Sequence, residues 1–110
     1  MPNRILEIGT SDGERTLELA AALPAGGLLI TMEPDAACAA AARRRFADAG
    51  VADRVSVIIG EPARFLHKVR GPFDLIVQNG AGDPDGLHER LMALLRPGGV
   101  LIRGDRQYSG

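Results

Sequence analysis

The feature that most constrains this chain is a regular alternation of short apolar runs with longer stretches that suit a helix. The apolar runs have the length of strands and are bounded by Gly, Pro or Asp, at positions 4–8, 28–32, 54–59, 73–77 and 100–103. The stretches between them predict helices at 14–23, 35–49, 62–69 and 85–95. Strands that alternate with helices are typical of a parallel sheet whose right-handed crossovers cover both faces. We therefore predict an α/β fold, a three-layer α/β/α sandwich with a mainly parallel sheet.

The same pattern indicates a single domain over residues 1–110. Leu28-Leu29-Ile30 and Leu75-Ile76-Val77 are continuous apolar runs, as expected of strands that are buried on both faces. A length of 110 residues suits one hydrophobic core, and the sequence contains no linker or internal repeat. The Ala-rich helix at 35–49 is expected to begin at an N-cap, Asp35, and to stop before Gly50.

Charge and cysteine content exclude several classes of protein. The 13 Lys and Arg residues balance 14 Asp and Glu residues, which argues against a strongly basic surface for nucleic acid. No apolar run approaches the ~18 residues of a membrane span, and residues 1–4 lead into a strand rather than a signal peptide. A single cysteine, Cys38, cannot form an internal disulfide and is expected to be a small core residue. We expect a cytoplasmic protein without a nucleic-acid or membrane partner.

The loop after the first strand, Gly9-Thr10-Ser11-Asp12-Gly13, is a candidate ligand site. Its two glycines allow a ligand to approach the backbone, and N–H groups at the next helix start can meet an anion. The loop is equally consistent with a tight turn in which Ser11 is the N-cap and Glu14 completes a capping box. The sequence leaves both interpretations open, and they are compatible with each other.

Glu33 follows the second strand and indicates the kind of ligand. It lies 20 residues after Gly13, the spacing at which an acidic side chain accepts hydrogen bonds from ribose hydroxyls in nucleotide-binding folds. The alternative is a surface carboxylate near a helix start, but Asp35 is the better cap and leaves Glu33 without a structural task. Ser11 occupies the middle position of a Gly-x-Gly-x-x-Gly fingerprint, which argues against a dinucleotide-binding oxidoreductase. A nucleoside without a pyrophosphate fits better.

The run from Ile5 to Gly13, Ile-Leu-Glu-Ile-Gly-Thr-Ser-Asp-Gly, resembles the first motif of class I S-adenosylmethionine (SAM)-dependent methyltransferases. Further segments resemble the catechol and caffeoyl-CoA O-methyltransferase branch, in order and at matching spacing, at 29–33, 49–55, 60–62, 71–77 and 94–102. The resemblance covers almost the whole chain. It implies a Rossmann-like sheet of about five strands in the order 3-2-1-4-5.

The resemblance also implies a set of cofactor-binding residues. The loop at 9–13 would lie with Glu7 under the methionine part of SAM, Glu33 would hold the ribose, and Glu61 would face the adenine. Pro62 departs from the small residue usual there, and Glu61-Pro62 also reads as a helix start with Pro in its first turn. The full expected set is Glu7, Gly9, Thr10, Ser11, Gly13, Glu33, Pro34, Gly60, Glu61 and Asn79.

The positions at which this chain departs from the family predict that no divalent metal binds. Metal-dependent members carry Asp after the fourth strand and Asp-Asn after the fifth, whereas this chain has Asn79 and then Gly104-Asp105. One amide and one displaced carboxylate are poor ligands for a hard cation. Asp83 and Asp85 are additional candidate ligands, but they also read as a turn and a helix cap. The catalytic lysine of those members is absent as well.

The implied reaction is methyl transfer from SAM to a small-molecule acceptor at a hydroxyl oxygen. Because the sulfonium is an activated leaving group, catalysis requires mainly alignment and removal of the acceptor's proton. Asp105 is the expected base and Tyr108 is expected to line the acceptor pocket, while His67, His88 and Arg43-Arg44-Arg45 are expected at the surface. The alternative function is a non-catalytic domain of the same fold that binds the nucleoside cofactor or a protein partner.

A last expectation concerns the edge of the sheet. The segments that resemble the family end with the fifth strand, without the family's final antiparallel strand pair. Strand five is then expected to be an open edge whose unpaired backbone groups favour pairing with another chain. The sequence thus predicts either a homo-oligomer formed through strand five or a trimmed cofactor-binding core.

Overall fold

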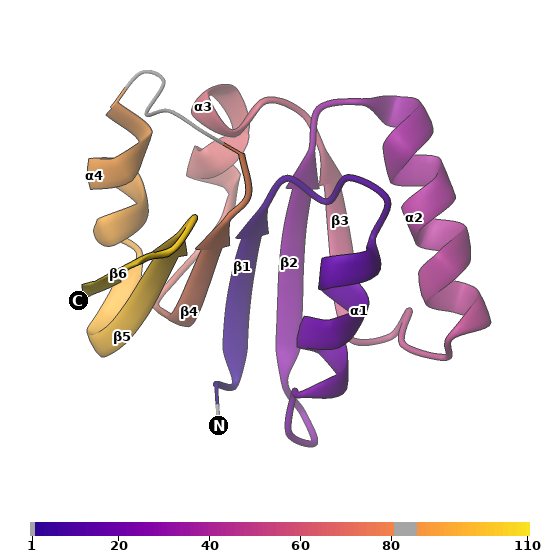
Figure 1. Cartoon of the computed structure of the whole chain (residues 1–110), viewed down its shortest axis with the longest axis horizontal. Helices are drawn as coiled ribbons and strands as arrows, with labels where there is room; N and C mark the ends of the chain where they lie inside the picture. The colour runs from indigo at the N-terminus through magenta and orange to yellow at the C-terminus, as the bar shows by residue number, and fades with distance from the viewer. Residues whose placement is uncertain (1, 81–85) are drawn as a thin grey trace.

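The computed structural model describes residues 2–80 and 86–110. Along the chain these residues form β1 (Arg4–Ile8), α1 (Glu14–Ala21), β2 (Leu28–Glu33), α2 (Ala36–Asp48), β3 (Val55–Ile59), α3 (Pro62–Phe65), the 3₁₀ turn η1 (Leu66–Lys68), β4 (Phe73–Gln78), α4 (Leu87–Met92), β5 (Leu95–Arg103) and β6 (Arg106–Ser109) (Figure 1). In this described part, the strands make one six-stranded sheet in the order β3-β2-β1-β4-β5-β6. Strands β1 to β5 run parallel and β6 is antiparallel.

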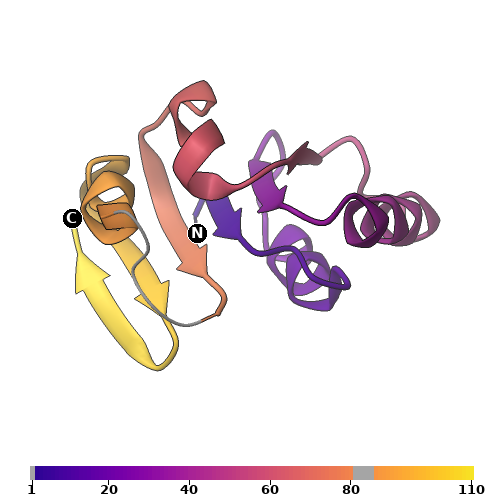
Figure 2. The same cartoon turned by 90° about the horizontal axis from the view of Figure 1, so that it is seen from above.

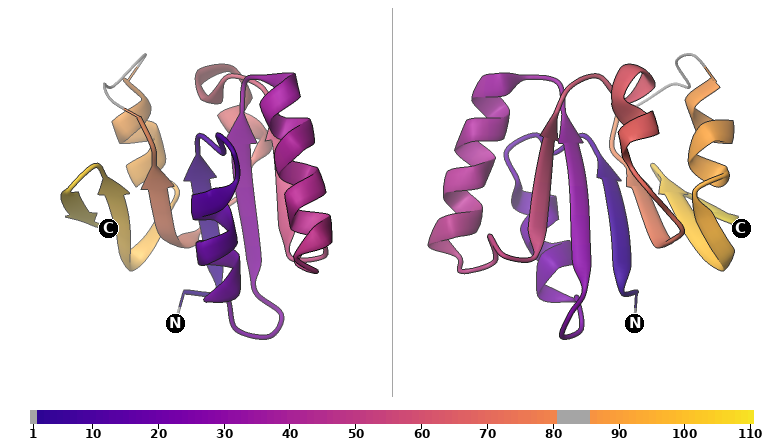
Figure 3. Two further views of the ribbon diagram at one scale, coloured as in Figure 1. Left: turned by 45° about the vertical axis from the view of Figure 1, so that its right-hand side comes forward. Right: turned by 180° about the vertical axis from the view of Figure 1, so that it is seen from behind.

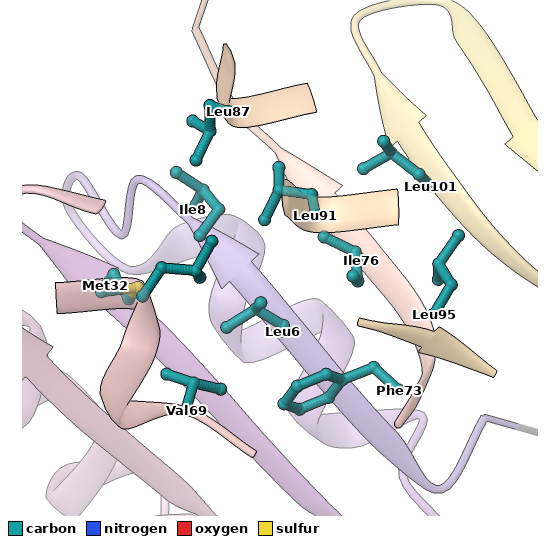
Figure 4. Packing of buried hydrophobic residues seen from close by; sticks show 11 residues of the cluster. Leu6, Ile8, Met32, Val69, Phe73, Ile76, Leu87, Leu91, Leu95 and Leu101 are labelled. Atoms are coloured by element: carbon teal, nitrogen blue, oxygen red, sulfur yellow. The ribbon is translucent and has the colours of Figure 1, made fainter. Parts of the chain in front are cut away.

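The predicted three-layer α/β/α sandwich is confirmed. Helices α1 and α2 lie on one side of the sheet, and α3 and α4 lie on the other (Figures 1 and 2). The α1–α2 side buries a cluster of Ile5, Ala20, Leu23, Leu29, Ala42, Phe46 and Val51. The larger cluster fills the α3–α4 side around Leu6, Ile76, Leu91 and Leu101 (Figure 4). Because apolar residues of β2 and β4 pack against both clusters, the runs 28–30 and 75–77 are apolar throughout.

Helix α2 shows how local sequence sets an element's ends. Asp35 is the N-cap, as predicted, and its Oδ1 accepts a hydrogen bond of 3.0 Å from the amide of Cys38. The helix stops at Asp48, before Gly50 with its φ of +75°. Cys38 itself is half-buried rather than a core residue, because Ala39, Ala42 and Phe46 occupy the buried face of the helix.

The predicted boundaries of the other helices need correction. Helix α1 ends at Ala21, two residues before the predicted end, and the helix predicted at 62–69 divides into α3 and η1. The described helix α4 ends at Met92, whereas the prediction continued it to Leu95; its predicted start, Asp85, lies outside the described residues. The cause is that Leu95 already pairs with Phe73 and begins β5, through a register shift beside Pro97-Gly98-Gly99.

The prediction of an open edge at the fifth strand is wrong. Residues 106–109 return as β6 and pair with β5 from Val100↔Ser109 to Arg103↔Arg106 (Figure 3). A tight turn at Gly104-Asp105, with Gly104 at a φ of +63°, makes this return possible. The order 3-2-1-4-5 is therefore confirmed, with a sixth strand added outside β5. Among the described residues, no helix has the length and apolar character needed to span a membrane.

Candidate functional site

A buried carboxylate, Glu7, organises the carboxyl ends of the central strands. Its Oε1 accepts hydrogen bonds from the hydroxyls of Thr16 on α1 and Thr31 on β2, the latter at 2.7 Å. Its Oε2 accepts a hydrogen bond of 3.1 Å from Nδ2 of Asn79, which follows β4. Thr10 completes the group through a hydroxyl contact of 2.6 Å with Thr31. We call these five side chains the Glu7 cluster; it joins three strands and one helix.

Burial controls the electrostatics of this cluster. The Glu7 side chain is fully buried, and burial raises its pKa above the ordinary value of 4.5. Hydrogen bonds from Thr16, Thr31 and Asn79 and the charge of Arg15 act in the opposite direction. Because a charge is costly to bury, a bound cation or a further hydrogen-bond donor stabilises a buried ionised carboxylate strongly.

The loop at residues 9–13 contributes Thr10 to the Glu7 cluster and is held largely by backbone hydrogen bonds. The amides of Gly9 and Thr10 donate to the carbonyl of Met32 at 2.8 and 3.2 Å, and Asn79 Nδ2 donates to the carbonyl of Gly9 at 2.8 Å. Gly13 has a φ of +86°, and a Cβ there would lie 3.0 Å from the ring of Phe46. Glycine is therefore required at Gly13 by both conformation and space.

The capping-box interpretation of this loop is wrong. Gly13, in the left-handed region, occupies the N-cap position of α1, and no side chain caps the helix there. The amide of Glu14 instead donates a hydrogen bond of 3.0 Å to Oδ1 of Asp12. The helix starts after Gly13 because this residue turns the chain, which leaves Ser11 exposed in the loop.

Glu33 has a structural task that the sequence did not suggest. Its Oε1 accepts a hydrogen bond of 2.8 Å from the amide of Ser11, and its Oε2 accepts one of 3.0 Å from the amide of Asp35. The residue is only 7% exposed, so this carboxylate connects the loop after β1 to the loop after β2. Each oxygen keeps a lone pair, and a ligand hydroxyl can still donate to it.

The third loop of this edge follows β3. Gly60 donates its amide to the carbonyl of Glu33 at 2.9 Å, and a Cβ at Gly60 would lie 2.3 Å from the ring of Phe65. Glu61 is exposed and stands at the N-cap position of α3 with Pro62 at the first turn, which confirms the helix-start interpretation. Pro34 is exposed beside Glu33.

The structure thus brings most of the expected cofactor residues to one edge. Hydrogen bonds connect Glu7, Gly9, Thr10, Ser11, Gly13, Glu33, Gly60 and Asn79. Asp105 is not part of this network but is exposed in the β5–β6 turn, after the carboxyl end of β5, and Tyr108 packs against His88 of α4. His67 and the three arginines at 43–45 are exposed, as expected, whereas His88 is half-buried.

Sequence reasoning did not identify Thr16 and Thr31, although both are fully buried. A polar Thr31 inside the apolar run 28–32 was the available signal. A surface hollow of about 440 Å³ lies elsewhere, beside β4 to β6, lined by Pro2, Asp74, Leu75, Val100, Ile102 and Gln107. None of the expected cofactor residues borders this hollow.

Over residues 2–80 and 86–110, no three His, Cys, Asp or Glu side chains come together as metal ligands would. Both hydrogens of the Asn79 amide are engaged, by Glu7 and by the carbonyl of Gly9. The earlier candidates Asp83 and Asp85 lie outside the described residues.

Comparison with known proteins gives a consistent match. A family model described as O-methyltransferase matches residues 2–110. Catechol O-methyltransferase from Niastella koreensis is 34% identical over 103 residues, which cover 89% of this chain and 47% of that protein.

Solved structures agree with this match. The O-methyltransferase TomG from Streptomyces achromogenes, crystallised in complex with SAM, has a TM-score of 0.86 and 36% identity, covering 93% of this chain and 48% of its own. An O-methyltransferase from Bacillus cereus in complex with S-adenosylhomocysteine (SAH) has a TM-score of 0.84 and 33% identity. The match covers 93% of this chain and 49% of that one. The chain thus spans about half the length of the relatives it matches.

Proposed function

This chain belongs to the O-methyltransferase family, and from that membership we propose that it binds SAM and transfers its methyl group to a hydroxyl oxygen of a small-molecule acceptor. The observation that carries the proposal is the pair of carboxylates, Glu7 and Glu33, fixed at the carboxyl ends of neighbouring parallel strands. Ligands of such sheets bind at this edge, between the loops that follow the strands.

Each part of the edge suits a different part of the cofactor. The carboxylate of Glu33 is held in place by two backbone amides, so it accepts ribose hydroxyls without first being ordered. The loop at 9–13 and Glu7 beneath it present backbone groups and negative charge to the methionine end. Gly60 and the exposed Glu61, in the loop after β3, are proposed to face the adenine.

The reaction requires little covalent chemistry from the protein. SAM, when bound, supplies an activated methyl group, whose bond to sulfur breaks as the bond to the acceptor oxygen forms. The hydroxyl proton passes to a base, for which we propose Asp105 in the β5–β6 turn. The ends of β4 and β5 align the acceptor. Because this chain has the neutral Asn79 where metal-dependent members carry an aspartate, no step is assigned to a metal.

The proposed setting follows from the charge and cysteine content. A net charge of −1 suits a small-molecule acceptor rather than nucleic acid, and no membrane partner is proposed. The single, half-buried Cys38 is consistent with a cytoplasmic location.

Calorimetric titration with SAM and SAH tests the binding step. Both ligands are expected to bind, and Glu33→Ala is expected to weaken binding by about 1–3 kcal/mol through loss of a charged hydrogen-bond acceptor. Glu18→Ala, which removes an exposed carboxylate from α1, is the matched control and should bind as the unaltered chain does. Circular dichroism verifies that Glu33→Ala remains folded. Absence of binding at millimolar ligand contradicts the proposal.

Turnover is tested separately with a panel of phenols and catechols, with and without Mg²⁺. Methylated product from at least one acceptor supports the enzyme. Binding of SAM without any product would instead favour the non-catalytic cofactor-binding domain.

A further inference from the structure

Three side chains form a cluster at the acceptor end of the sheet that the proposed function has not yet used. Arg103, the last residue of β5, places Nη1 3.3 Å from Nδ1 of His88 on α4. Its guanidinium carbon lies 5.7 Å from the centre of the Tyr108 ring on β6. The rings of His88 and Tyr108 meet edge to face, with centroids 4.6 Å apart. Each member therefore contacts the other two, and the arginine is held in one orientation by β5, β6 and α4.

The charge of Arg103 is not neutralised within this cluster. Arginine has no acceptor and stays protonated, so the guanidinium donates and Nδ1 of His88 accepts as a neutral ring nitrogen. An aromatic face stabilises a cation without cancelling its charge. The single ion pair found in the described part of the chain joins Arg96 to Asp74, at the opposite end of the sheet. Arg103 is half-buried and still has N–H groups that no described residue engages.

The position of Arg103 connects it to the cofactor edge. Arg103 is the register partner of Gln78 on β4, and Gln78 is the partner of Ile8, which immediately precedes Gly9. Two strand spacings thus separate Arg103 from the start of the loop at 9–13, or about 10 Å across the sheet. That distance suits a small ring whose reacting hydroxyl faces the cofactor and whose far end reaches the arginine.

We propose that Arg103 binds a carboxylate of the methyl acceptor, so that the acceptor is a small aromatic hydroxy acid. This inference rests on the proposed function. A guanidinium is planar and donates two parallel hydrogen bonds to a carboxylate, which adds geometric selection to charge. His88 and Tyr108 are positioning residues, because they fix the guanidinium before the acceptor arrives.

The test compares two probes that differ only by a carboxylate, 3,4-dihydroxybenzoate and catechol. Each is titrated by calorimetry into the full chain saturated with SAH. The acid is expected to bind about 10-fold more tightly than catechol or better, the effect of a charged hydrogen-bonded pair. Arg103→Gln is expected to remove this preference, while SAH affinity and catechol affinity stay unchanged. Arg106→Gln makes the same charge change on the register partner of Arg103 in β6, an exposed residue outside the cluster, and should keep the preference.

The outcomes separate this inference from the proposed function. If SAH fails to bind, the proposed function itself is contradicted. If SAH binds but the acid gains nothing over catechol, or neither probe binds, the inference about Arg103 is overturned. The same holds if Arg103→Gln keeps the preference, or if Arg106→Gln removes it equally, because a general effect of net charge would then account for the result.

Discussion

The buried carboxylate of Glu7 is the residue on which the candidate site depends most. Among the described residues it has no cationic partner in hydrogen-bonding contact, and its donors there are two hydroxyls and one amide. Burial raises its pKa, so the folded protein binds a proton at Glu7 more tightly than the unfolded chain does. Glu7 therefore stabilises the fold most below its ordinary pKa, and this contribution is lost as pH rises through the folded value.

Glu7→Gln tests this linkage. The amide keeps one acceptor for Thr16 and Thr31 but turns an NH₂ group toward the NH₂ of Asn79, so the variant is expected to lose about 1–3 kcal/mol at low pH. Because the variant has no charge to bury, this penalty should shrink as pH rises from about 4 to 8. Urea unfolding at several pH values measures it. A penalty that grows with pH would show that the ionised form is the better-stabilised one.

At the scale of elements, Asp74 ties together the starts of three strands. Its Oδ2 accepts hydrogen bonds of 2.9 Å from the amides of Asn3 and Arg4, and its Oδ1 accepts one of 2.7 Å from Arg96. The bond from the Arg4 amide is the largest cause of a lowered Asp74 pKa, with the Asn3 amide and the Arg96 charge adding to it. This contribution to stability is present above the unfolded pKa, near 3.8, and is lost as pH falls through the folded value.

Two variants decide which of these bonds matters. Asp74→Asn is expected to lower the free energy of unfolding by about 1–2 kcal/mol at pH 7, because two backbone amides lose a charged acceptor. Arg96→Gln removes only a surface ion pair, with Arg96 47% exposed, and should cost less than about 1 kcal/mol. Chemical denaturation at pH 7 and below pH 3 provides the comparison. Equal losses for the two variants, or an Asp74→Asn penalty that persists in acid, would contradict this assignment.

At the scale of the whole molecule, the layers were predictable because the local sequence of each element shows which of its faces are buried. Leu75-Ile76-Val77 is apolar throughout since both faces of β4 are covered, and Asp35 caps α2 through a residue only three positions away. The bonds of Glu33 were not predictable, because they depend on the path of a loop that Gly13 redirects. Strand β6 was also missed, since Arg-Gln-Tyr-Ser is too short and too polar to show a period.

Strand β6 determines which backbone groups are exposed at this edge of the sheet. With β6 in place the outermost strand at this edge, opposite the β3 edge, has four residues and carries the exposed Arg106, features that discourage pairing with another sheet. The full chain is therefore expected to sediment as a monomer. Deletion of residues 104–110 removes one Asp and one Arg, so the net charge stays at −1 while the longer β5 becomes an unpaired edge.

The shortened chain is expected to associate as its concentration rises, because β5 then offers unpaired backbone groups and the half-buried Val100 and Ile102 to another copy. Sedimentation velocity over a concentration series measures this, and circular dichroism verifies that the sheet persists. Since the charge is unchanged, association of the shortened chain alone assigns the effect to the lost strand. A shortened chain that stays monomeric with intact structure would show that β6 is not needed to prevent association. Dimerisation of the full chain would show that β6 does not prevent association.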